Sequence, residues 1–390
     1  MAWHRWNWQQ EDWPHFQWNA DALIAQETQF LQQSGILIGA AHHMNEDDQA
    51  RLVIDLITDE ALKTSEIEGE YLSRDSVQAS ILRNFGFETD HRRVEPSERG
   101  IADLMTDLYK NFDKPLSHAM LYRWHKMISN GRTDLKDIGR YRRASEPMQV
   151  VSGYIGNPTV HFEAPPSDAV KPEMDRFVTW FKDTAPEGKQ PLPAITRAGI
   201  AHLYFVSIHP FEDGNGRIGR ALAEKALSEC LGAPTLTALS HTIQDNRKAY
   251  YAALEKNNKS NSVEDWMSYF SKTVLNAQSH SLDVVKFLIE KAKFYDNAKG
   301  RINDRQEKAI ARIFQEGVGG FKGGLSAKNY ITITGAFRAT ATRDLQDLVE
   351  KGLFVKKGKL KSTRYFPNLE RYNPEKEIEA RQSGPLFRIP

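Results

Sequence analysis

The sequence has few of the features that mark secreted or membrane-spanning proteins. Cys230 is the only cysteine in 390 residues, so no disulfide can form within the chain and a cysteine-based zinc site would lack ligands. No run of about 18 apolar residues occurs, and the first residues are too polar for a signal peptide. We therefore expect a cytoplasmic protein without a membrane partner.

The chain also lacks an excess of charge of either sign. Lys and Arg total 52 and Asp and Glu total 51, so a preference for nucleic acids or anionic membranes would have to be local. Such a bias exists at 300–369, where 14 basic residues accompany 6 acidic ones. The length predicts two or three domains of about 100 to 200 residues each.

Tryptophan is concentrated at the start of the chain. Five of the eight tryptophans fall within the first 18 residues, at Trp3, Trp6, Trp8, Trp13 and Trp18. Large aromatic rings bury much apolar area, so this segment is predicted to be a strap whose rings pack into the folded body. The alternative is a ligand-binding surface.

Apolar residues at spacings of three and four predict a mainly α fold. Helices are expected within 20–110 and over 115–130, 166–183, 194–208, 217–231 and 262–298. Two β-prone runs, 148–151 and 160–162, are separated by Gly, Asn, Ser and Pro residues, which predicts a hairpin with a longer loop. A hairpin within a helical domain suggests a flap.

The basic segment after residue 300 has a different pattern. Its expected elements are helices over 304–314, from 326 and over 339–351, then strands over 353–356 and 363–366. Three helices and a hairpin with a basic link resemble a winged helix-turn-helix, which reads DNA through its third helix. The candidate readers are Arg338, Thr340, Thr342 and Arg343. The alternative is a dimerisation or protein-docking module.

A glycine-rich turn after His209 leads into a predicted helix. Backbone N–H groups at such a turn and the positive end of the helix form a site for phosphate. Arg217 and Arg220, three residues apart on one helical face, can bind further phosphate oxygens. Asp213 offers a carboxylate for Mg²⁺. His209, with an ordinary pKa of about 6.5, can take a proton from an attacking hydroxyl.

Two other phosphate-binding patterns do not suit this segment. Residues 214–219 match G-x-G-x-x-G, but the residues before them follow a helical rather than a strand pattern, which disfavours a Rossmann fold. The P-loop sequence G-x-x-x-x-G-K-[ST] occurs nowhere in the chain.

The segment His209-Pro-Phe-Glu-Asp-Gly-Asn-Gly-Arg-Ile-Gly-Arg220 resembles the Fic-domain motif H-P-F-x-[DE]-G-N-G-R-x-x-R at every defined position. The resemblance spans about 104–276 and implies transfer of AMP from ATP, with Mg²⁺, to a Ser, Thr or Tyr hydroxyl of a protein target. Transfer of UMP, phosphocholine or phosphate stays open. Self-modification and a homodimer are also compatible with the family.

The resemblance implies the following domain order: an N-terminal strap and helical region at 1–100, a Fic core at 101–280, a helical linker at 281–299, a winged helix at 300–370 and a tail at 371–390.

Carried over residue by residue, the resemblance makes His209 the base and Asp213 the Mg²⁺ ligand. The implied nucleotide- and phosphate-binding residues are Asp213, Gly214, Asn215, Gly216, Arg217, Ile218, Gly219, Arg220, Tyr250, Tyr251 and Asn258. Without the resemblance, two tyrosines on one helix would be more typical of a hydrophobic core than of a ligand-binding site. The implied flap edge, which would add the target as a further strand, is Val160, His161 and Phe162.

An inhibitory element is implied upstream. Thr64-Ser-Glu-Ile-Glu68-Gly69 resembles the family signature [ST]-x-x-x-E-[GN], in which Glu68 would pair with Arg220 and block productive ATP binding. Glu68 could also orient water for the removal of AMP. The alternative is an acidic surface helix, because Glu66 and Glu70 lie beside Glu68.

A non-enzymatic function is the second hypothesis. In it, residues 300–370 bind nucleic acid and the Fic-like core only senses nucleotide. The intact His209 argues against it, because sensing alone needs no base.

Overall fold

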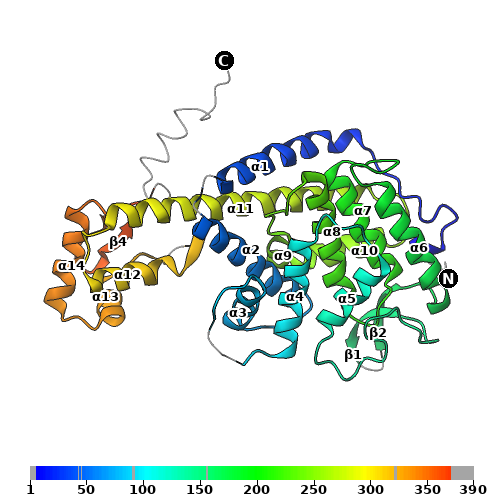
Figure 1. Cartoon of the computed structure of the whole chain (residues 1–390), viewed down its shortest axis with the longest axis horizontal. Coiled ribbons are helices and arrows are strands. Elements are labelled where there is room, and N and C mark those ends of the chain that lie inside the picture. Colours follow the sequence, from blue (N-terminus) through cyan, green and yellow to red (C-terminus); the bar gives the residue numbers. More distant parts are fainter. Residues whose placement is uncertain are drawn as a thin grey trace, which may run out of the picture. The chain divides into compact units, whose positions relative to one another are not determined.

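The computed structural model describes residues 6–369 except 43, 45, 90–92, 155–156 and 320–322, so Trp3 and the expected tail at 371–390 lie outside the described residues. The chain divides into two compact units, residues 1–281 and 282–390. The described elements are mostly helices, with two antiparallel hairpins, which confirms the mainly α fold class (Figure 1). No helix within the described ranges is both long enough and apolar enough to span a membrane.

The first unit is built from helices and one hairpin. In chain order the elements are α1 (Ile24–His42), α2 (Glu46–Ile67), α3 (Arg74–Asn84), α4 (Pro96–Lys110), α5 (His118–Ile128), β1 (Gln149–Tyr154), β2 (Asn157–Glu163), α6 (Ser167–Asp183), α7 (Ala194–Ile208), α8 (Asn215–Leu231), α9 (Leu239–Asp245), α10 (Arg247–Asn257) and α11 (Glu264–Ala298). Helix α11 is continuous, and the division between the two units falls within it.

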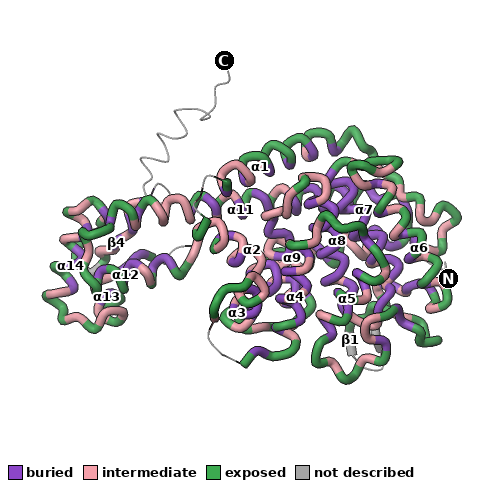
Figure 2. Tube along the Cα trace, in the orientation of Figure 1, coloured by how far each residue is buried: buried purple, intermediate pink, exposed green. Residues whose placement is uncertain are grey.

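Helices α7 and α8 form the centre of the first unit. Almost every residue of α7 is buried, as its nearly continuous apolar sequence requires (Figure 2). Gly219 of α8 allows a close approach, because a β-carbon there would lie 3.0 Å from Val206 Cγ1 on α7. Trp266 closes the core and donates from Nε1 to Gly199 O at 2.8 Å. Replacing Trp266 with Ala would lower the free energy of unfolding by about 3 to 5 kcal/mol. These two helices are thus a rigid base for the turn that joins them.

The tryptophan-rich start packs onto this body, as predicted. Trp13 contacts the Tyr204 ring edge to face, with 5.2 Å between ring centroids. Trp6 contacts Phe162 of β2 at 5.5 Å, and Trp8 Nε1 donates to Glu163 O at 2.7 Å. The strap therefore holds the base of the β1–β2 hairpin against the helical body.

The hairpin is longer than the sequence predicted. Its register pairs Val151 with Val160 and Ser152 with Thr159, and the ladder continues to Tyr154 and Asn157. The prediction of a long loop from 152 to 158 was therefore wrong. Glycine and proline do not end these strands, because a two-stranded hairpin consists only of edge strands, where unpaired backbone groups face outward.

The second unit contains the C-terminal elements in the predicted order: α12 (Asp304–Phe314), α13 (Ala327–Thr334), α14 (Arg338–Glu350), β3 (Phe354–Lys357) and β4 (Arg364–Pro367). Asn303 caps α12, because its Oδ1 accepts from the backbone N–H groups of Arg305 and Gln306 at 3.1 Å. The buried Tyr330 hydroxyl donates to Asp344 Oδ2 at 3.0 Å and ties α13 to α14. Short 3₁₀ turns complete the elements: η1 (Asn7–Gln9), η2 (Asp21–Leu23), η3 (Gly317–Gly319) and η4 (Leu360–Ser362).

Candidate active site

The turn between α7 and α8 is fixed by its own side chains. His209 ends α7 in the left-handed region, with φ of 50°, and Gly214 precedes α8 with φ of 79°. Asn215 closes the turn by bonding both backbone groups of Phe211: Oδ1 accepts from its N–H at 3.0 Å and Nδ2 donates to its carbonyl at 2.8 Å. A short side-chain amide places a donor and an acceptor on separate atoms that fit the two backbone groups of Phe211, which accounts for asparagine at this position.

His209 has the properties of a neutral base. Its Nδ1 lies 3.2 Å from Val206 O. A carbonyl oxygen only accepts hydrogen bonds, so Nδ1 carries the proton and Nε2 keeps its lone pair. Burial lowers the pKa of His209 to about 4, although the hydrogen bond to the Val206 carbonyl acts in the opposite direction. The imidazole is therefore neutral at pH 7 and can accept a proton through Nε2.

Arg142 positions His209 from the other side of the turn. Its Nε donates to His209 O at 2.8 Å, and its own backbone N–H donates to Pro210 O at 2.9 Å. Nη1 also donates to Ser167 Oγ at 3.0 Å, so the buried guanidinium joins the turn to the start of α6. Sequence reasoning missed Arg142, because its partners lie 25 and 67 residues away and no spacing marks it.

In this structure a carboxylate of the same chain lies at the start of α8, where the sequence predicted phosphate binding. A β-carbon on Gly216 would collide with Glu68 Oε1, so the carboxylate lies directly against the first turn of α8. Buried Arg217 Nε and Arg220 Nη1 have no hydrogen-bond partner among the described residues. Orphaned guanidinium donors beside a helix N-terminus suit the oxygens of a polyphosphate.

Glu68 binds Arg220 as the sequence predicted. Arg220 Nη2 donates to Glu68 Oε1 at 2.8 Å and to Thr64 O at 2.9 Å, and Arg220 Nε donates to Thr64 Oγ1 at 2.8 Å. Burial lowers the pKa of Arg220, but the Glu68 carboxylate outweighs it and the net shift is upward. Thr64, in the last turn of α2, and Glu68, just after the helix, therefore both bind Arg220. These are two of the defined positions of the inhibitory signature.

A second carboxylate after α2 binds the other arginine. Arg217 Nη1 donates to Glu70 Oε2 at 2.8 Å. The sequence identified Glu70 only as part of an acidic stretch, although its partner is one of the predicted phosphate-binding residues. The pair was missed because it joins positions 147 residues apart.

Asp213 lies between two arginines. Its Oδ1 accepts from Gly214 N at 2.7 Å, and its Oδ2 accepts from Arg132 Nη1 at 2.6 Å and Arg217 Nη2 at 3.4 Å. Burial raises the pKa of Asp213, but Arg217 and these hydrogen bonds outweigh it and keep the carboxylate ionised. An ionised, partly exposed carboxylate beside a phosphate site fits Mg²⁺, which takes one or two carboxylates with water and phosphate oxygens. Arg132 was not predicted.

The residues expected around adenosine fall into two groups. Tyr250 is buried, and its hydroxyl lies 2.9 Å from His202 Nε2 in the core. Tyr251 is more exposed, and its hydroxyl donates to Ile67 O at 3.1 Å and Glu68 Oε2 at 3.3 Å. Asn258 donates from Nδ2 to His161 O at 2.9 Å. Tyr251 therefore borders the Glu68–Arg220 contact and Asn258 borders the β1–β2 hairpin, and the nucleotide-binding roles of all three stay predictions.

The remaining predicted residues divide between the flap and the core. Val160 is exposed on β2, whereas Phe162 is buried beneath Trp6. His161 Nδ1 lies 3.1 Å from Glu255 Oε2 of α10. Ile218 is fully buried and Gly219 packs against α7, so these two residues lie on the core side of α8.

A second contact between α2 and α8 joins two carboxyl groups. Glu60 and Glu224 are both buried, and each carboxyl group shifts the pKa of the other. Burial raises the pKa of Glu60 and raises that of Glu224 further, with the neighbouring carboxylate adding to the effect on Glu224. The raised pKa favours the protonated form of Glu224, which can donate a hydrogen bond to Glu60. Both oxygens of Glu60 also accept from Ser240 N, at 2.8 and 2.9 Å.

Comparison with known proteins agrees with this geometry. Residues 115–227 match the Fic/DOC family, and residues 6–87 match a domain of unknown function, DUF4172. A probable protein adenylyltransferase of Aquifex aeolicus is 31% identical over 120 residues, which cover 30% of this chain and 34% of that protein. Protein adenylyltransferase fic-1 of Caenorhabditis elegans is 27% identical over 165 residues, 42% of this chain and 28% of that protein. The matches thus span about a third or less of these relatives.

Solved structures share the fold. A Fic family protein from Desulfovibrio desulfuricans superposes with a TM-score of 0.51 at 19% identity, over 91% of this chain and 98% of that one. A Fic domain containing signalling protein from Bacteroides thetaiotaomicron gives 0.51 at 18% identity, over 67% of this chain and 97% of that one. The chain therefore shares the fold of these Fic proteins, and the resemblance in fold extends beyond residues 115–227, which match the Fic/DOC family.

Proposed function

We propose that this Fic-domain chain is a protein adenylyltransferase that transfers AMP from ATP to a Ser, Thr or Tyr hydroxyl of a protein target. One observation carries the proposal: a single turn holds a neutral imidazole, His209, next to an anion site formed by the start of α8 and two arginines. A base beside a polyphosphate site is what nucleotidyl transfer to a hydroxyl requires. The names of the Aquifex and Caenorhabditis relatives support the choice of AMP.

The reaction is an in-line displacement at the α-phosphorus of ATP. The hydroxyl oxygen of the target forms a bond to the α-phosphorus while the bond from that phosphorus to the bridging oxygen breaks, and pyrophosphate leaves. His209 Nε2 takes the hydroxyl proton, a contribution of about 10² to 10⁴ in rate. Arg217 and Arg220 would bind the oxygens of the leaving pyrophosphate, where charge accumulates during the reaction.

Asp213 would hold Mg²⁺, which neutralises phosphate charge when bound. Arg132 would then have to release Asp213 Oδ2. Arg132 would keep two hydrogen bonds after this release, because its Nε and Nη2 donate to Asp134 at 2.8 and 2.6 Å. Asp134 therefore keeps Arg132 neutralised when Asp213 binds the metal.

Glu68 holds the enzyme inhibited. Its carboxylate occupies the guanidinium of Arg220 and the first turn of α8, so phosphate oxygens must displace it before ATP adopts the reactive pose. The same carboxylate could orient a water against an AMP-modified target, which would make removal of AMP a second reaction of this site. The target would bind along the exposed β2 edge at Val160 as an added strand.

The test uses ATP labelled at the α- or the γ-phosphate, with Mg²⁺, and follows label on protein, including self-modification. Glu68→Gly should retain label only from the α-position, and Glu68→Gly/His209→Ala should retain none. Label only from the γ-position would indicate phosphate transfer. No label from either position, with label from UTP or a phosphocholine donor instead, would contradict the choice of AMP.

We also propose that the second unit binds nucleic acid through α14 and the β3–β4 hairpin. The supporting observation is that basic side chains of both elements are exposed: Arg338 and Arg343 on α14, and Lys356 and Lys357 on β3. Binding of a duplex should weaken with salt, and Arg338→Ala/Arg343→Ala should reduce the salt slope by about 1 for each phosphate that the variant no longer neutralises. Lys308→Ala, which removes an exposed charge from α12, is the control. An equal reduction in both variants would contradict the assignment.

A further inference from the structure

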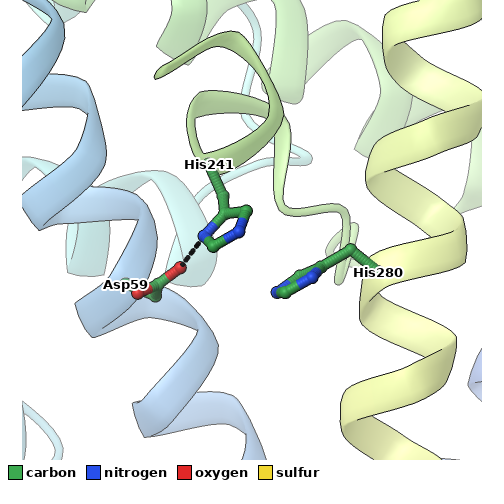
Figure 3. Close-up of side chains that lie close together, drawn as sticks. All are labelled: Asp59, His241 and His280. Atoms are coloured by element: carbon green, nitrogen blue, oxygen red, sulfur yellow. Dashed lines mark hydrogen bonds and ion pairs between the residues drawn. The ribbon is translucent and has the colours of Figure 1, made fainter. Parts of the chain in front are cut away.

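Three metal-ligating side chains meet in the first unit, away from the Fic motif. They are Asp59 of α2, His241 of α9 and His280 of α11, and their ligand atoms all lie within 4.8 Å of one another (Figure 3). All three residues are partly exposed, so an ion could reach them from solvent. No step of the proposed transfer reaction uses any of them.

The ligand atoms of the three side chains lie close together, but the two histidine rings must turn before their in-plane lone pairs meet at one ion. His241 Nδ1 lies 2.9 Å from Asp59 Oδ2. The rings of His241 and His280 are stacked, with 4.0 Å between centroids and 19° between planes. A tetrahedral Zn²⁺ with bonds of about 2.0 to 2.2 Å would separate its ligand atoms by about 3.3 Å. Small rotations of partly exposed side chains would close the remaining gap.

The backbone beside each ligand is held by buried hydrogen bonds. Ser240 N, next to His241, donates to both oxygens of Glu60, which follows Asp59 in α2. Ala238 N donates to the buried Ser281 Oγ, next to His280, at 3.2 Å. The three ligands are therefore carried on segments tied to one another, and few degrees of freedom are lost when an ion binds.

Neighbouring charges orient two of the ligands. Arg74 Nη1 contacts Asp59 Oδ1 at 3.4 Å, which leaves Oδ2 directed at His241. Asp245 Oδ2 lies 3.6 Å from His241 Nε2, on the ring nitrogen opposite the cluster. At 3.6 Å the Asp245 carboxylate makes no hydrogen bond to Nε2. A small movement would let it accept the Nε2 proton and favour the tautomer that coordinates through Nδ1.

We propose that Asp59, His241 and His280 bind a divalent transition metal ion of the Zn²⁺ class, with water completing the coordination. Two imidazoles and one carboxylate select this class over Mg²⁺ and Ca²⁺, which prefer oxygen ligands alone. The bound ion would join α2 to α9 and α11. This site is independent of the Fic motif, so the proposal stands or falls separately from the proposed transfer of AMP.

The test titrates Zn²⁺ into the chelator-treated full chain without an affinity tag. We expect one Zn²⁺ per chain with a Kd in the micromolar range or tighter, and visible absorption of a tetrahedral site when Co²⁺ replaces Zn²⁺. Zn²⁺ at about 100 times its Kd should raise Tm by about 5 °C. His241→Ala and His280→Ala should each weaken binding at least tenfold.

His118→Ala is the matched control, because His118 Nε2 also contacts a carboxylate, Asp175 Oδ1 at 2.8 Å, without a second histidine. It should bind Zn²⁺ as wild type does. Asp59→Asn preserves the shape of the site and should also lose Zn²⁺ binding. The test therefore stays decisive even if the histidine variants fail to fold. Wild-type affinity in Asp59→Asn, equally weakened binding in His118→Ala, or no binding to wild type would overturn the proposal.

Discussion

Helix α2 and the turn that follows it contact α8 through two glutamates in different surroundings. Glu68 lies against the positive Arg220 at the catalytic end, whereas Glu60, two turns earlier, lies against the carboxyl group of Glu224. The first contact is an ion pair that anionic ligands can replace. The second needs a proton and no ligand competes for it. The same helix therefore combines a replaceable contact at the active site with a contact that is independent of substrate.

The difference indicates how α2 could release the active site without leaving the protein. Displacement of Glu68 by phosphate oxygens removes the hydrogen bond to Arg220, while Glu60 remains bonded to Ser240 N and Glu224. The proposed inhibition could thus be relieved by a local movement of the turn that follows α2. The predictions below separate the two contacts.

The largest effect is expected from the base itself. Because neither α2 contact supplies a base, His209→Ala should lower AMP transfer by about 10² to 10⁴ even in the Glu68→Gly background. The measurement is the initial rate of label transfer from α-labelled ATP. In Glu68→Gly the rate should also stay level from pH 8 down to about pH 5, because the pKa of His209 is about 4. A decline centred on pH 6.5 would contradict the lowered pKa of His209, although it would still fit a histidine base.

A smaller effect is expected at the metal ligand. Asp213→Asn in the Glu68→Gly background should lower Mg²⁺-dependent turnover by about tenfold or more, while ATP affinity falls less, because the carboxylate acts mainly on the charge of the reacting phosphates. Turnover and ATP binding by calorimetry give the two values. Equal losses would indicate a structural role for Asp213 through Arg132 and Gly214.

The proton-dependent contact predicts a pH effect on stability. The pKa of Glu224 in the folded chain is raised well above its ordinary value of 4.5. The stability from its hydrogen bond is therefore complete below pH 4.5 and is lost as the pH rises through the folded pKa. Glu224→Gln keeps a donor toward Glu60 at every pH.

The measurement is Tm of wild type and Glu224→Gln from pH 5 to pH 9. The Tm of Glu224→Gln minus the Tm of wild type should increase as the pH rises. The increase should be about 2 to 4 °C for each kcal/mol of stability that wild type loses. Buried histidines affect both proteins alike and cancel in the difference. A difference that does not change with pH would show that Glu224 is ionised in the folded chain.

The smallest effect is expected at Glu70. Its ion pair with Arg217 is partly exposed and screened by solvent, so Glu70→Gln should raise AMP transfer by about twofold to fivefold at most. The assay is transfer from α-labelled ATP at low ionic strength. A gain as large as that of Glu68→Gly would mean that Arg217, rather than Arg220, limits productive ATP binding.

Local signals in the sequence predicted the helices well. Helix α12 begins and ends where expected, at Asp304 and Phe314, because Asn303 caps it and its apolar spacing is regular. Helix α8 begins at Asn215, two residues before the predicted start, because Gly214 is already the left-handed cap. The hairpin strands extend beyond their β-prone runs, since pairing between strands outweighs local preference there.

The site was predictable only where a contiguous motif carries it. Glu68 and Arg220 were paired through the family resemblance, and the structure contains that contact. Arg142, Glu70 and the Glu60–Glu224 pair join distant segments whose spacing carries no periodic signal. The histidines of the Asp59 cluster lie about 180 and 220 residues beyond that aspartate, so only the packing of α9 and α11 against α2 reveals the site.

The most direct measurement of the central claim is the single-turnover rate of AMP transfer at saturating ATP in wild type and Glu68→Gly, with Glu70→Gln as the neighbouring control. A charge-assisted hydrogen bond of about 1.5 to 3 kcal/mol predicts a gain of at least about tenfold in Glu68→Gly, well above the gain in Glu70→Gln. Equal rates in wild type and Glu68→Gly would contradict inhibition by Glu68.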